Sequence, residues 1–156
     1  MKTLKTILII LLIALIGMQF YRPQDNDAEV RDVASFEAET KPSPEIRTIM
    51  ENTCYDCHSN KTVYPWYAEI APVSYWIADH VDEGNEHFNA SVWDTYDDKK
   101  KDHKLEELIE EVEEGEMPLN EYTWLHGGAL NEEQRQAVIQ WAEQARSNYK
   151  MGMSAE

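Results

Sequence analysis

The segment Cys54-Tyr55-Asp56-Cys57-His58 has residue types and spacing that could do chemistry. It contains both cysteines of the chain, and a histidine follows the second one directly. The C-x-x-C-H pattern is typical of the attachment site of a c-type haem. Two thiols one helical turn apart can each bond a vinyl group at the porphyrin edge, and the adjacent imidazole can ligate the iron. The motif therefore predicts one covalent haem c, with Cys54 and Cys57 as attachment points and His58 as the proximal iron ligand.

Other kinds of site also use a cysteine pair. A thioredoxin-like redox pair follows a strand in a βαβ unit, and no such pattern is visible here. A zinc site needs four ligands at characteristic spacing, and the chain has no further cysteine. A disulfide between these cysteines would close a very small loop and stabilise little. Haem attachment is therefore the favoured interpretation.

The N-terminal segment 1–22 is typical of an export signal. A positive start precedes an apolar run from Thr6 to Phe20, which is broken only by Gly17 and Gln19. Because covalent haem c is attached outside the bacterial cytoplasm, this segment and the motif support each other. No A-x-A-like cleavage site follows, so we expect an uncleaved signal anchor rather than a cleaved signal peptide. The expected location is the cell envelope, either anchored in the inner membrane and facing the periplasm or soluble in the periplasm after cleavage.

The rest of the 156-residue chain divides by composition. Residues 23–43 are acidic, contain proline and lack clear periodicity, which indicates a tether. Residues 44–150 have the length of a single compact domain, and we assign the haem to them. Residues 151–156 form the expected tail.

The formal net charge is −16. Such a charge excludes nucleic acid as a partner and leaves the N-terminal segment as the expected contact with a membrane. An acidic, solvated surface that keeps an exported protein soluble explains the charge adequately. The functional alternative is steering toward a redox partner protein with a basic docking surface.

Every element that the sequence indicates is a helix. Ser43 before Pro44 predicts an N-cap and a helix that delivers the cysteines at its end. Further helices are expected at Val73–Val81 ended by Gly84, at Lys104–Glu114 ended by Gly115, and after Asn131 with Gln134 completing a capping box. The predicted fold is all-α, with a loop-rich haem pocket and a preceding N-terminal hydrophobic helix.

The second axial ligand is expected to be Met117. It lies after a predicted helix end and before Pro118, which restrains it to an extended conformation. A thioether ligand raises the reduction potential of the iron. The alternative ligand is His126, which precedes two glycines and could reach the pocket. His80 is expected to lie on a helix and to make a hydrogen bond within the fold.

Several further segments complete a recognisable pattern. The stretch from Pro44 to Trp141 resembles the bacterial haem-binding domain family of small exported proteins. The resemblance is carried by the C-x-x-C-H segment, Tyr64-Pro65-Trp66-Tyr67, Ala71-Pro72-Val73-Ser74, Asn89-Ala90-Ser91-Val92-Trp93, Met117-Pro118-Leu119, Tyr122 and Trp141. It implies a cytochrome c-like domain with covalent haem ligated by His58 and Met117.

Two functions follow as expectations. A membrane-tethered electron-transfer protein needs no catalytic residue and suits iron with both axial positions filled. The alternative is a haem enzyme accessory, or a gas or redox sensor, whose distal position opens. Domains that resemble this one occur beside peroxidase-like cytochromes, which keeps a peroxidase-associated role open.

Overall fold

The computed structural model describes residues 2–153, and every named element in this range is helical. The elements are α1 (Lys2–Met18), α2 (Ala34–Thr40), α3 (Pro44–Ile49), η1 (Met50–Cys54), η2 (Trp66–Glu69), α4 (Val73–His87), η3 (Ala90–Thr95), α5 (Asp98–Glu114), α6 (Asn120–His126) and α7 (Glu132–Met153). Within the described range, strand-like pairing is confined to an isolated antiparallel bridge between Asp27 and Lys61. The all-α prediction is confirmed for this part of the chain. The tail expected at 151–156 begins inside α7, and residues 154–156 lie outside the described residues.

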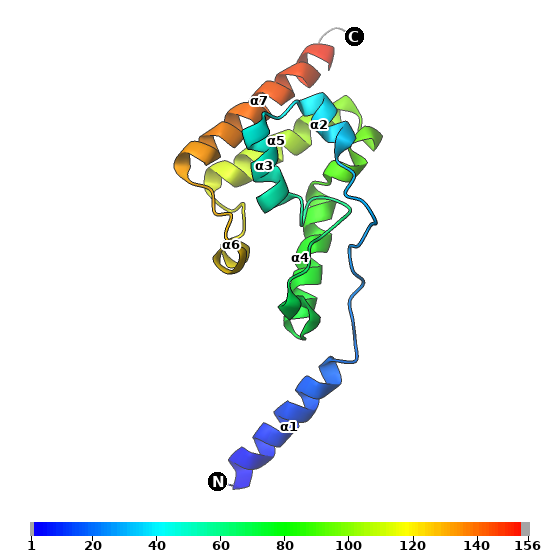
Figure 1. Cartoon of the computed structure of the whole chain (residues 1–156), viewed down its shortest axis with the longest axis vertical. Helices are drawn as coiled ribbons and strands as arrows, with labels where there is room; N and C mark the ends of the chain where they lie inside the picture. The colour runs from blue at the N-terminus through cyan, green and yellow to red at the C-terminus, as the bar shows by residue number, and fades with distance from the viewer. Residues whose placement is uncertain (1, 154–156) are drawn as a thin grey trace.

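The two long helices α5 and α7 run side by side at one end of the molecule, and α2 and α3 pack against α7 (Figure 1). The apolar stripe of α5 is formed by Leu105, Ile109 and Val112, all buried. Opposite it, Val138 and Ala142 of α7 are almost fully buried. Helix α4 extends from this end toward α1, which lies outside the helical core and whose Met18 carbonyl accepts a hydrogen bond from the Tyr75 hydroxyl of α4 (Figure 1).

Phe36 of α2 lies at the centre of the core and is fully buried. Four aromatic rings meet it edge to face, at centroid distances of 4.9 to 6.4 Å, and they belong to Tyr55, Phe88, Trp93 and Trp141. This geometry places positive ring edges against negative ring faces. Phe36 therefore packs α2 against a ring of the cysteine motif and against rings of the segments that follow it.

The segment 23–43, expected to be a tether, instead folds onto the domain. It contains α2 with Phe36, and its earlier part pairs with the turn after the motif. The Thr62 N–H donates to the Asn26 carbonyl at 2.9 Å, and the Ala28 N–H donates to Asn60 at 3.2 Å. The sequence indicated a tether because a single buried ring and backbone pairing leave no hydrophobic periodicity.

The predicted helix ends are largely confirmed where a local signal exists. The Ser43 hydroxyl accepts from the Ile46 N–H at 3.2 Å, as an N-cap does. Asn131 and Gln134 form the reciprocal capping box, with hydrogen bonds of 2.9 and 3.0 Å. Gly115 ends α5 in the left-handed conformation, with φ of 81°. Helix α6 and the turn η3 had not been predicted.

Helix α4 does not end at Gly84 as predicted but continues to His87. A Cβ atom on Gly84 would lie 2.8 Å from the Cys57 carbonyl oxygen. The glycine is therefore explained by the close approach of α4 to the cysteine motif, and not by a helix end.

The predicted N-terminal hydrophobic helix is present as α1, and none of its residues is buried. It has 17 residues, fewer than the roughly 20 that span a bilayer core. In the part of the chain that the structure describes, no helix has the length and apolar character needed to cross a membrane. The predicted membrane-spanning anchor is therefore not found.

The role of Phe36 predicts that Phe36→Ala lowers the free energy of unfolding by about 3–5 kcal/mol, since the ring contacts would be replaced by a cavity. The control Val30→Ala, at a position 70% exposed in the same segment, should stay within about 0.5 kcal/mol of wild type. Urea unfolding followed by circular dichroism measures both. Equal stability of the two variants would contradict the placement of α2 in the core.

Candidate haem site

The cysteine motif begins in a π-helical turn. Helix α3 leads into η1, where the Tyr55 N–H donates to the Met50 carbonyl at 2.9 Å. The Cys57 and His58 N–H groups then both donate to the Cys54 carbonyl, at 3.2 and 3.0 Å. The turn is tight enough to gather both thiols and the imidazole at one helix end. The motif was predicted at a helix end, but the π-helical turn was not; such turns are frequent at functional sites.

The His58 ring is held by the C-terminal end of α4. Its Nδ1 lies 2.8 Å from the Gly84 carbonyl oxygen and 2.9 Å from that of Phe88. Because both partners are acceptors, Nδ1 carries the proton and Nε2 keeps its lone pair. No hydrogen bond to Nε2 is present among the described residues.

The protonation of His58 agrees with this geometry. Burial lowers the pKa of the His58 imidazole, although the two carbonyl contacts act in the opposite direction. The ring is therefore neutral at pH 7, as a metal ligand must be. Metal-ligating histidines commonly donate their other N–H to a backbone carbonyl, which fixes the tautomer and the ring orientation.

Cys54 and Cys57 are free thiols in the structure. Burial raises the pKa of Cys54 to about 12, with a further contribution from Cys57. Burial also raises the pKa of Cys57 to about 11, and the neighbouring Asp56 carboxylate adds to this effect. Reactive redox cysteines have a lowered pKa, so this environment disfavours a thioredoxin-like function.

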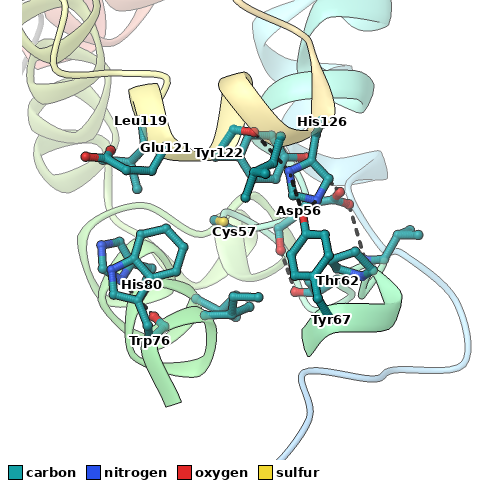
Figure 2. A pocket seen from close by; sticks show the side chains of 15 residues that line it. Asp56, Cys57, Thr62, Tyr67, Trp76, His80, Leu119, Glu121, Tyr122 and His126 are labelled. Carbon is teal, nitrogen blue, oxygen red and sulfur yellow. Dashed lines mark hydrogen bonds between the residues drawn. The ribbon is translucent and has the colours of Figure 1, made fainter. Parts of the chain in front are cut away.

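A cleft opens beside the motif, with Cys57 near its centre (Figure 2). Trp76 and His80 of α4 lie on one side, and Tyr122 and His126 of α6 line the cleft from another. The space between its walls amounts to about 500 Å³ when open solvent is included. The exposed lining is almost entirely apolar, which suits a flat macrocycle such as a porphyrin.

The two predicted sixth ligands, Met117 and His126, lie in different environments. Met117 is half-buried against the hydrophobic core and is not among the residues that line the cleft. His126 does line the cleft: its Nδ1 donates to the Tyr122 carbonyl at 2.9 Å, and its Nε2 meets the Tyr67 hydroxyl. The identity of the sixth ligand stays a prediction, with both residues retained.

His80 also lines the cleft, and its Nδ1 donates to the Trp76 carbonyl one turn earlier, at 2.8 Å. The expected hydrogen bond of His80 within the fold is therefore present.

Asp56, the residue before Cys57, has a role that the sequence did not reveal. Its carboxylate forms an ion pair with Arg31 and accepts from the Tyr122 hydroxyl at 3.1 Å. Burial raises the pKa of Tyr122, as does the adjacent carboxylate, so the phenol remains a donor. These partners are 25 and 66 residues away in the chain, and no local spacing could have signalled them.

The comparisons with known proteins bear on this geometry. The model of a haem-binding domain family matches residues 13–144. The chain belongs to this haem-binding domain family. The match includes the cysteine motif and every residue that lines the cleft, and it supports haem as the cofactor. No curated protein and no solved structure gives a significant match, so the likeness to the cytochrome c fold stays a prediction.

The residues at the motif fit a haem by their own chemistry. Cys54 and Cys57 offer free protonated thiols, and the neighbouring His58 offers an unprotonated Nε2. Of these three residues, Cys57 lines the apolar cleft, whereas Cys54 and His58 do not. Covalent attachment and the axial ligands go beyond what the family match establishes.

The close approach of α4 predicts that Gly84→Ala lowers both thermal stability and haem content. The added Cβ would lie 2.8 Å from a backbone oxygen, so α4 must move and take the carbonyl partners of His58 with it. Alanine alone should favour the helix by about 1 kcal/mol. The matched control is Glu86→Ala at an exposed position of α4. A Gly84→Ala protein with control-level melting temperature and haem content would contradict this packing.

Proposed function

We propose that this haem-binding domain is an exported c-type haem protein that transfers electrons. The observation that carries the proposal is the orientation of His58, whose Nδ1 is fixed by two carbonyls while Nε2 keeps its lone pair, in a motif whose two thiols are free. In this proposal Cys54 and Cys57 hold one haem by thioether bonds, and His58 ligates the iron. The bound haem supplies reversible one-electron chemistry at the iron.

Electron transfer is the function that suits iron with both axial positions filled. Met117 is the proposed sixth ligand because its thioether favours ferrous iron and because it lies two residues before Leu119, where this wall of the cleft begins. Reaching the iron requires Met117 to leave its present contacts with the core. His126 is the alternative ligand, already at the cleft.

Location and partner follow from charge and from the N-terminal segment. We propose that residues 1–22 direct export and associate with the membrane, because α1 exposes apolar side chains along its whole length. The net charge of −16 favours a basic redox partner protein, since opposite charges steer association. The proposed location is the bacterial cell envelope, on the periplasmic side.

A second function is favoured by a specific contact in the cleft. The Tyr67 hydroxyl meets His126 Nε2, so a proton donor and an acceptor lie together near Cys57 (Figure 2). Such a pair suits a haem with an open distal side, either as a gas or redox sensor or as a peroxidase-associated accessory. Access of a small ligand to the iron decides between the two functions.

Absorption spectra of the exported protein, oxidised and reduced, with and without carbon monoxide, test the proposal. Electron transfer predicts low-spin iron in both states and no rapid carbon monoxide complex. Met117→Ala should then produce high-spin iron that binds carbon monoxide, while His126→Ala keeps the wild-type spectrum. The reverse pattern would assign the sixth position to His126. Rapid carbon monoxide binding by the wild-type protein would instead favour the sensor or enzyme accessory.

A further inference from the structure

Helix α6 forms a wall of the cleft without being part of the core. Leu119 and Tyr122 line the cleft from this helix and its N-cap, yet no residue of α6 is buried. Gly115 precedes the segment with φ of 81°, and Gly127 and Gly128 follow it with φ of 76° and 84°. Elements with few buried apolar contacts open locally at low free-energy cost.

Polar contacts hold α6 in place instead. The Tyr122 hydroxyl donates to Asp56 Oδ2 at 3.1 Å, and Arg31 pairs with the other carboxylate oxygen. At the end of α6, His126 meets Tyr67 of η2, and the Tyr122 and His126 rings stack with centroids 4.4 Å apart. A hydrogen bond to an ionised carboxylate is among the stronger polar contacts in proteins.

Asp56 connects α6 to the cysteine motif. It lies directly before Cys57, so its carboxylate moves with the proposed attachment turn. Arg31 also donates to the Lys61 carbonyl at 2.9 Å, which fixes the guanidinium on the far side of Asp56. Asp56 is therefore held in place by its own contacts, whereas α6 has no buried residue.

We propose that Asp56 is a positioning residue that holds α6 closed over the cleft through Tyr122. In this arrangement α6 gates access of small neutral ligands, such as diatomic gases or peroxide, to the haem. Because Met117 lies two residues before Leu119, opening of α6 also changes where the predicted sixth ligand can reach. The gating role rests on the proposed haem function. The closing contact, which is the hydrogen bond from Tyr122 to Asp56, does not depend on haem.

Tyr122→Phe removes the closing hydrogen bond and keeps the ring. The matched control is Tyr149→Phe in α7, which also removes a phenol-to-carboxylate hydrogen bond, from Tyr149 to Glu39 at 2.9 Å, in the packed helical end of the molecule. Amide hydrogen exchange of residues 119–128 in the purified full chain is the first readout. It should rise about tenfold in Tyr122→Phe and stay unchanged in Tyr149→Phe.

The carbon monoxide association rate of the reduced protein is the second readout, which a merely structural hydrogen bond would not change. It should also rise about tenfold in Tyr122→Phe. Asp56→Ala should reproduce both effects, and adding Tyr122→Phe to it should change little, since Asp56→Ala already removes the contact between Tyr122 and Asp56. Unchanged exchange in Tyr122→Phe would overturn the closing contact.

Faster exchange with an unchanged association rate would overturn the gate. If the purified chain carries no haem, the proposed function fails, and with it the gating of ligands. The exchange measurement still decides whether Asp56 positions α6, because it needs no bound haem.

Discussion

The hydrogen bonds from His58 Nδ1 to the Gly84 and Phe88 carbonyls are the contacts on which the site depends. They fix the tautomer of the imidazole and leave Nε2 as a potential iron ligand. The Gly84 carbonyl already accepts the Phe88 N–H at 2.9 Å, and it takes the His58 N–H on its second lone pair. The same contacts require α4 to lie so close to the motif that position 84 has no room for a Cβ.

Packing in the hydrophobic core also holds the end of α4 and the cysteine motif in place. Phe88, which supplies one carbonyl to His58, packs its ring against Phe36 at a centroid distance of 5.4 Å. Tyr55 of the motif is also fully buried and meets Phe36 edge to face. The N-terminal segment and the candidate haem site are therefore held by the same packing around Phe36. The cleft wall α6 stands outside this core and depends on polar contacts.

Sequence reasoning succeeded where the chemistry is local. The Ser43 and Asn131 caps and the turn at Gly115 each depend on neighbours a few residues away, and they could be predicted. The buried position of Phe36 could not, because its partners lie up to 105 residues away along the chain. Gly84 was misread as a helix end for the same reason.

The candidate site could be predicted only in part, because some of its contacts join residues that lie far apart in the sequence. Family membership and the helical class are confirmed, but the contacts of Asp56 with Arg31 and Tyr122 join segments with no shared pattern. The apolar run at the N-terminus indicated a helix correctly, but α1 does not reach the length of a membrane span. Periodicity and composition report on local burial and cannot tell which distant side chains meet.

The most direct test of the central claim is the mass of the exported chain after denaturation. Covalent attachment at Cys54 and Cys57 predicts that the unfolded polypeptide retains the mass of one haem and its visible colour. Replacing both cysteines with alanine should return the mass to that of the polypeptide alone. A wild-type chain that releases its haem on unfolding, or never carries one, would contradict the account.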